Sequence, residues 1–319
     1  MRRSQASRSG LTPADVVVVF FVVLVVLLFV IMGLTRARES ARLAMCQNNL
    51  AQIGKALAYY DDAYAGLPAV GVPVAIDSPI DGAPPGPLRA MLETLGVASF
   101  LGLDPDGSNL PALRAPTPEA IPVAGFLCPS DGRAMAGLFP SPVSYRAATG
   151  GDPRGSDGPF AIGRRTTLAE VERRDGTSFT AAFAERLIGN DRPVDAPENY
   201  VVAEHWFDRP IGRVTVQAPQ PLDYRGDAGM TWRPADFRYT LYNHTSPPAS
   251  PFSGVSPDGR SAAMGASSAH VRGVNMLMLD GSAKLVAPTI SHEVWQAYGT
   301  IGPQTSTPSE SDPPQAPRN

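Results

Sequence analysis

The sequence predicts an α+β protein in which one long N-terminal helix leads into a domain built mainly of antiparallel strands. Three features of the 319 residues support this prediction. An apolar run occupies residues 16–34, a seven-residue apolar repeat continues to residue 64, and the chain contains 33 prolines and 30 glycines. So many prolines and glycines favour short strands and turns, whereas a hydrophobic content of 43% allows a sizeable core.

The apolar run is long enough to cross a membrane. Residues 16–34 contain no charged and no strongly polar side chain. These 19 residues, at a helical rise of about 1.5 Å each, match the ~30 Å hydrocarbon core of a bilayer. A cleaved signal peptide has a shorter apolar stretch, of about 7–15 residues. We therefore expect a single span that stays attached to the following domain.

Charges on the two sides of this run predict its orientation. Residues 1–10 hold three arginines and no acid, whereas residues 36–42 mix three arginines with Glu39. Basic residues are enriched on the cytoplasmic side of a span, so we expect a cytoplasmic N-terminus and a periplasmic or extracellular C-terminal domain. The formal net charge of -3 gives no electrostatic case for binding nucleic acid.

Beyond the apolar run, a stripe of apolar side chains continues along one helical face. Its members recur every seven residues, with a second set three residues later: Leu43, Leu50, Leu57 and Tyr64, then Cys46, Ile53 and Tyr60. Gly66 and Pro68 end the helix. Because only about three heptads are present, a sheet of the same chain is a better cover for this stripe than a coiled-coil partner.

A hairpin is predicted near the C-terminus. Val274, Met276 and Met278 alternate with residues of the other face, and a second alternating run follows at residues 283–286. Asp280-Gly281 lies between the two runs. An Asp-Gly pair in this position favours a two-residue type I′ turn, in which both central residues have positive φ.

The chain has two cysteines, Cys46 and Cys128, and neither lies in a C-x-x-C pair. Sequence motifs for redox catalysis and for zinc binding are therefore absent. In an oxidising compartment a disulfide between the two is the simplest arrangement. Two buried free thiols are the alternative, and the sequence leaves both open.

The N-terminus resembles that of type IV prepilins. A short basic leader, Gly10, Leu11, Thr12 and Asp15 precede the apolar helix in the order found there. The resemblance implies that a prepilin peptidase cuts between Gly10 and Leu11 and that the new amine is methylated. Asp15, where glutamate is usual, would offset the amine of a neighbouring subunit, because an unpaired charge near lipid is costly. Leu11 in place of phenylalanine and Pro13 also depart from the pattern, so an uncleaved anchor with Asp15 at the membrane interface is the alternative.

The rest of the chain resembles a large planctomycete family of pilin-like proteins, the domain of unknown function 1559 (DUF1559) family. Its C-terminal hallmark is a histidine, nine residues and Asp-Gly, which His270, Asp280 and Gly281 match. Further blocks that resemble the family lie at residues 46–68, 128–131, 144–150, 175–186 and 242–248. The resemblance implies no common catalytic role.

Several candidate sites have a simpler structural interpretation, which we prefer. His270 and Asp280 are a possible metal or catalytic pair, but Asp280 fits the turn and His270 a strand cap. The acidic loop at residues 152–158 is a possible calcium site, but a solvated loop explains it. Trp206, Trp232 and Trp295 are possible sugar-binding aromatics, but large aromatics belong more often to the core. No G-x-S-x-G motif is present. We expect no enzyme activity, no metal and no cofactor.

These features divide the chain into a basic leader (residues 1–10), a transmembrane and amphipathic helix (11–64), a β-rich domain outside the cytoplasm (65–302) and a disordered polar tail (303–319). They predict a pilin- or pseudopilin-like protein of the inner membrane, a structural or assembly component of a type II secretion or type IV pilus-like system. Its expected partners are the inner membrane, a prepilin peptidase and other pilin-like subunits. A membrane-anchored binding module for a polysaccharide, peptide or solute is the alternative.

Overall fold

The computed structural model describes residues 13–96, 121–134, 136–203 and 223–302. The expected leader and tail, with Gly10 and Leu11, lie outside the described residues. The chain forms two compact units, Met1–Ala44 and Met45–Asn319, so their boundary falls inside the long helix rather than at its end.

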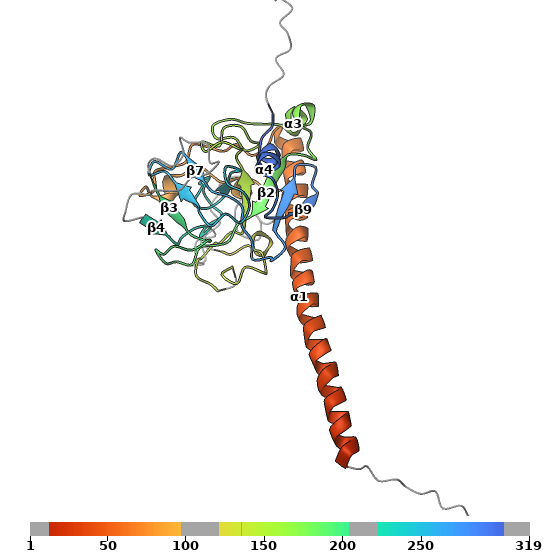
Figure 1. The fold of residues 1–319 in the computed structure, drawn as a ribbon. Coiled ribbons are helices and arrows are strands. Elements are labelled where there is room, and N and C mark those ends of the chain that lie inside the picture. Colours follow the sequence, from red (N-terminus) through yellow and green to blue (C-terminus); the bar gives the residue numbers. More distant parts are fainter. Residues whose placement is uncertain (1–12, 97–120, 135, 204–222, 303–319) are drawn as a thin grey trace, which may run out of the picture. The chain divides into compact units, whose positions relative to one another are not determined.

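The expected N-terminal helix is present as one uninterrupted element, α1 (Pro13–Tyr64), 52 residues long (Figure 1). The helix ends where Ala65 takes a positive φ of 52° and Gly66 follows. In the first unit every large apolar side chain from Val16 to Leu34 is exposed. Among the described residues, α1 is the one helix long and apolar enough to cross a membrane, with an 18-residue window of mean hydropathy 3.5. That length and composition suit a single span and also suit a signal sequence.

The second half of α1 is part of the core of the second unit. Cys46, Leu50, Ile53 and Leu57 are each at most 1% exposed and join the main apolar cluster of the β domain. The heptad stripe is therefore covered by the same chain, as expected. Tyr64, at the helix end, is 47% exposed.

The larger sheet has five strands in the order β5-β1-β2-β8-β9. All neighbours pair antiparallel except β1 and β5, which are parallel. The strands are β1 (Tyr145–Ala148), β2 (Ala181–Glu185), β5 (Leu241–Tyr242), β8 (Val274–Met278) and β9 (Ala283–Val286).

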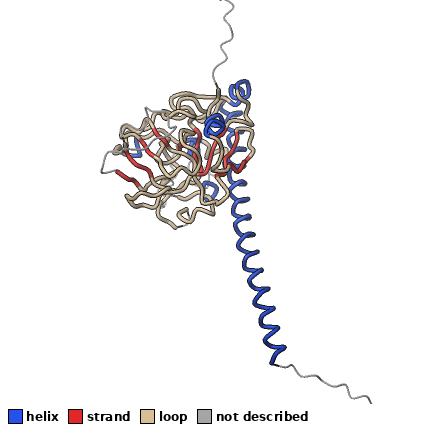
Figure 2. Tube along the Cα trace, in the orientation of Figure 1, coloured by secondary structure: helices blue, strands red, loops and turns tan. Residues whose placement is uncertain are grey.

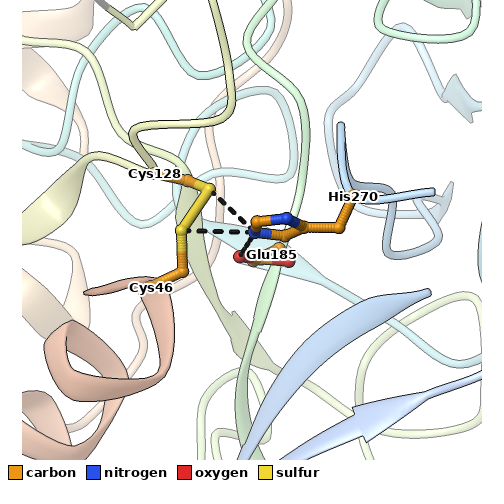
Figure 3. A group of neighbouring side chains, drawn as sticks. All are labelled: Cys46, Cys128, Glu185 and His270. Atoms are coloured by element: carbon orange, nitrogen blue, oxygen red, sulfur yellow. Dashed lines mark hydrogen bonds and ion pairs between the residues drawn. A yellow bond between two sulfur atoms is a disulfide. The ribbon is translucent and has the colours of Figure 1, made fainter. Parts of the chain in front are cut away.

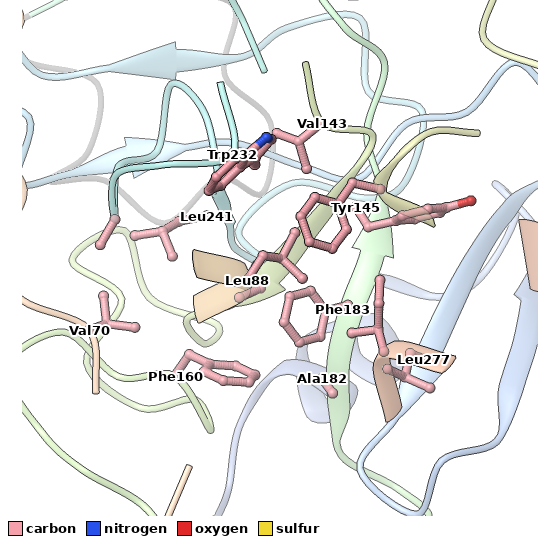
Figure 4. Close-up of a cluster of buried hydrophobic side chains, with 14 of the residues drawn as sticks. Val70, Leu88, Val143, Tyr145, Phe160, Ala182, Phe183, Trp232, Leu241 and Leu277 are labelled. Atoms are coloured by element: carbon pink, nitrogen blue, oxygen red, sulfur yellow. The ribbon is translucent and has the colours of Figure 1, made fainter. Parts of the chain in front are cut away.

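Both faces of this sheet are covered, which explains why β1, β2 and β8 are buried at every position. Leu277 of β8 packs in the same cluster as the α1 stripe. Val274, Met276 and Met278, which alternate with it, pack instead with Trp295 of α4 (His292–Gly299). Helices α1 and α4 therefore lie against opposite faces, and Figure 4 shows Leu277 among the side chains of the main cluster.

The smaller sheet has four strands in the order β4-β3-β6-β7, with β3 and β6 parallel and the other neighbours antiparallel. Most of the domain between the strands is loop, as the proline and glycine content predicts (Figure 2). The remaining elements are β3 (Tyr200–Val202), β4 (Asp223–Arg225), β6 (Gly254–Val255), β7 (Ala262–Ala263), α2 (Pro87–Ala90), α3 (Leu168–Arg174), η1 (Ile80–Gly82) and η3 (Ala124–Phe126).

The predicted hairpin is formed by β8 and β9, but its turn differs from the type I′ expectation. The Met278 N–H donates to the Ser282 carbonyl (2.8 Å), and the Gly281 N–H donates to the Met278 carbonyl (3.0 Å). The loop therefore holds three residues, Leu279–Gly281. Gly281 provides the positive φ, 84°, that a three-residue loop needs at its last position, so a two-residue turn was the wrong prediction.

Candidate functional site: a buried disulfide beside His270 and Glu185

The structure joins Cys46 and Cys128 in a disulfide, with their Cα atoms 5.3 Å apart. Cys46 lies in the buried stripe of α1, and Cys128 lies in the loop that follows η3. The bond thus ties the helix to a loop 82 residues further along the chain. Asn49, one turn after Cys46, reinforces this connection by donating to the Leu127 carbonyl (3.1 Å).

His270 lies directly against the disulfide (Figure 3). Its Nε2 atom is 3.4 Å from Cys46 Sγ and 3.5 Å from Cys128 Sγ. The same nitrogen is 3.5 Å from Oε1 of Glu185, the last residue of β2. The four residues are between 0% and 6% exposed, so four distant segments of the chain meet at one buried point.

Asn275 holds the Glu185 carboxylate in place. The Asn275 backbone N–H donates to Glu185 Oε2 (2.9 Å), and its side-chain amide donates to Oε1 (3.0 Å). Gln47, next to Cys46 on α1, in turn donates to the Asn275 side-chain oxygen (3.2 Å). Because a buried carboxylate is costly without such partners, these bonds make Glu185 an oriented acceptor beside His270.

The cluster borders a buried tyrosine and a small pocket. Tyr145 is buried near Glu185, and burial, followed by the Glu185 charge, raises the pKa of its phenol. The pocket is lined by Cys128, Asp131, Ser144, Glu185, Arg186, Leu187 and residues 267–269. Ser144 is 1% exposed, and its hydroxyl has no hydrogen-bond partner among the described residues.

The possible pairing of His270 with Asp280, which the sequence did not favour, is not what the structure shows. Asp280 lies in the β8–β9 turn, where its carboxylate accepts from the N–H and the hydroxyl of Ser282 (2.9 and 2.6 Å). His270 contacts the disulfide rather than capping a strand. Asp280 thus has its expected turn role, while His270 has a partner that the spacing of the motif does not indicate.

The residues of the other two candidate sites, the acidic loop and the tryptophans, are hydrogen-bonded within the loop or buried in the core. In the acidic loop, Asp157 accepts from the Gly151 N–H (2.8 Å), and Asp152 accepts from the N–H and hydroxyl of Ser156 (both 2.7 Å). Burial and the nearby Asp152 carboxylate raise the pKa of Asp157 to about 6. Trp232 and Trp295 are fully buried, so neither can form an exposed sugar-stacking surface.

Trp206 lies outside the described residues, as do Gly10 and Leu11. Asp15 lies in the first turns of α1. The residue that sequence reasoning missed is Glu185. It occurs in the block at residues 175–186 that carries the family resemblance, but only the pairing of β2 with β8 brings it to His270 and Asn275.

Together these features define a class of protein: a long apolar N-terminal helix whose second half packs on a mostly antiparallel, two-sheet α+β domain, which is the layout of pilin-like proteins. The chain belongs to the DUF1559 family, because a model described as "Protein of unknown function (DUF1559)" matches residues 35–293. No curated protein and no solved structure matches the chain.

Proposed function

We propose that this protein is a pilin-like subunit, anchored in the inner membrane by α1, that carries its α+β domain outside the cytoplasm and assembles with other pilin-like subunits. The role is structural and involves no catalytic step. It belongs to a type II secretion or type IV pilus-like system.

The observation that supports this proposal is that α1 serves two environments without a break. Its large side chains from Val16 to Leu34 are apolar and exposed, whereas those from Cys46 to Leu57 complete the domain core. An exposed apolar surface of this length is not stable in water and needs lipid or other apolar helices as cover. Because α1 is continuous, the residues that would anchor the protein and the residues that complete the domain core belong to one helix.

The prepilin-like residues supply the second element of the proposal. Cleavage after Gly10 would create an amine at Leu11, and Asp15 would be the fifth residue of the mature chain. Two opposite charges near lipid stabilise each other when neighbouring subunits pack their helices. The alternative function, a binding module with an aromatic pocket, gains nothing from Trp232 and Trp295, which are both in the core.

The test is the chemical state of the N-terminus after membrane extraction. We expect mass spectrometry to find a chain that starts at a methylated Leu11 in cells with a prepilin peptidase, and an intact leader in cells without one. Gly10→Ala should block cleavage, and Gly33→Ala, a glycine substitution in the middle of the same apolar helix, should not. An intact leader in the presence of active peptidase, or normal cleavage of Gly10→Ala, would contradict the proposal.

Assembly is tested separately with Asp15. Asp15→Asn removes the charge but keeps the size of the side chain, so membrane insertion should persist while co-purification with pilin-like subunits falls. Asp15→Glu, which restores the usual residue, is the matched control and should assemble at least as well as the natural chain. Equal assembly of all three proteins would exclude the charge pairing.

A further inference from the structure

We propose that the Cys46–Cys128 cluster has a second chemical state: when the disulfide is reduced, the two thiolates, His270 Nε2 and a Glu185 carboxylate oxygen bind one Zn²⁺. This site is independent of the pilin-like role proposed above. The proposal departs from our sequence-based expectation of no metal. The sequence did not indicate the site because its four ligands come from separate segments of the chain.

The geometry of the four side chains carries the proposal. One ligand atom from each residue can be chosen so that all four lie within 4.8 Å of one another. In a tetrahedral site with bonds of about 2.0–2.3 Å, ligand atoms lie about 3.3–3.8 Å apart. His270 Nε2 already has such separations, 3.4 and 3.5 Å from the sulfurs and 3.5 Å from Glu185 Oε1. Breaking the covalent bond lets the sulfurs separate, which is the main change the site requires.

The chemistry of the donors selects the ion. Two thiolates with one imidazole and one carboxylate favour Zn²⁺ and disfavour Ca²⁺ and Mg²⁺, which prefer oxygen ligands only. Thiolates and a carboxylate also supply the negative charge that a buried dication needs. With the disulfide intact the thiolates do not exist, so the cross-link and the ion exclude each other.

The residues around the ligands meet the other requirements of a metal site. Asn275 orients Glu185 through two hydrogen bonds, which is the role outer residues have around bound metals. The pocket beside the cluster is lined by two of the four ligands, Cys128 and Glu185, and by the exposed residue Ala269. The unpartnered Ser144 hydroxyl lines the same pocket and adds a polar group there.

The two states interconvert by balanced steps. A dithiol reductant gives two electrons and two protons to the disulfide, becomes a disulfide itself, and leaves thiols at Cys46 and Cys128. Binding of Zn²⁺ then releases both thiol protons. Because the ion occupies both sulfurs, it should hold α1 to the loop at Cys128 and slow reoxidation of the pair.

The test compares the oxidised and reduced forms of the full chain in detergent, so it needs no variant. After reduction with a phosphine and removal of free metal, we expect about one tightly bound Zn²⁺ per chain, and at least about tenfold less in the oxidised protein. Co²⁺ in the reduced protein should give a sulfur-to-metal charge-transfer band and the visible bands of a tetrahedral ion. Ca²⁺ and Mg²⁺ should not displace it.

Variants then assign the ligands. His270→Ala and Glu185→Gln should each weaken Zn²⁺ binding by about tenfold or more, whereas His292→Ala and Glu293→Gln, on α4, should leave it unchanged. If reduced and oxidised protein take up equal zinc, if cobalt shows no sulfur band, or if the two ligand variants bind as tightly as the natural chain, the site does not exist.

Discussion

Gly281, in the β8–β9 turn, packs against Gly54 of α1 so closely that a Cβ on Gly54 would lie 3.1 Å from the Gly281 Cα. The same Cβ would lie 3.0 Å from Leu277 Cδ1. His270, at the other end of the family motif, contacts Cys46 on the same helix. Cys46 and Gly54 are eight residues, or about 12 Å, apart along α1. Both ends of the histidine and Asp-Gly motif therefore contact α1. The motif thus has a structural role, because it packs the β8–β9 hairpin and the segment before it against this helix.

The Gly54–Gly281 contact predicts a loss of stability when a methyl group is added. Gly54→Ala should lower the free energy of unfolding by about 1 kcal/mol net, because the crowding cost of ~1–3 kcal/mol exceeds the ~1 kcal/mol gain in helix propensity. Urea unfolding followed by tryptophan fluorescence measures it, since Trp232 and Trp295 are buried. Gly33→Ala is the matched control, because its Cβ would meet nothing within 4 Å. A Gly54→Ala protein as stable as the natural chain would mean that the turn moves away freely.

Loss of the disulfide should destabilise the protein more than Gly54→Ala does. In the Cys46→Ala/Cys128→Ala double variant the free energy of unfolding should fall by about 4 kcal/mol, because the bond closes a loop spanning 82 residues and restricts the unfolded chain. The measurement is the same urea titration, with the oxidised natural chain as reference. Zn²⁺ should restore part of the stability of the reduced natural chain and none of that of the double variant. Alkylation before reduction should label no thiol in the oxidised protein, and two labelled thiols would contradict the bond.

His244 predicts a loss of stability in acid. Burial lowers the pKa of its imidazole to about 3, from an ordinary value of 6.5. The unfolded chain therefore binds a proton that the folded chain refuses, so the stabilising contribution is complete above pH 6.5 and falls as the pH drops toward 3. The slope reaches about 1.4 kcal/mol per pH unit. His244→Gln should flatten this part of the stability curve, and an unchanged slope would rule out a neutral buried imidazole.

Asp157 predicts a change of stability with pH that is opposite in direction to that of His244 over part of the same pH range. Its pKa in the folded protein is raised to about 6, from 3.8, chiefly by burial and then by Asp152. The folded chain now holds the proton more tightly, so this contribution to stability is complete below pH 3.8 and is lost as the pH rises toward 6. Asp157→Asn keeps an acceptor for the Gly151 N–H and should remove the trend. Denaturation midpoints between pH 4 and 7 test it, and identical curves for the two proteins would exclude the shift.

Local patterns in the sequence were sufficient to predict helix α1 and strands β8 and β9. The unbroken apolar run and heptad stripe predicted α1 to its end at Tyr64, because both follow from helical periodicity. Alternation predicted β8 and β9 in the same way. The turn between them was predicted with one residue too few, since Asp-Gly suits a two-residue turn and also the end of a three-residue turn.

What the sequence by itself determined is a helix with one apolar half and one amphipathic half, leading into a strand-rich domain with two cysteines. Only the tertiary structure decided that Glu185 and His270 meet those cysteines, because the contact depends on β2 pairing with β8 and on α1 packing against one face of the sheet. Residues 46, 128, 185 and 270 are separated by dozens of positions, and no spacing rule relates them. Their proximity follows from long-range packing, which local periodicity does not encode.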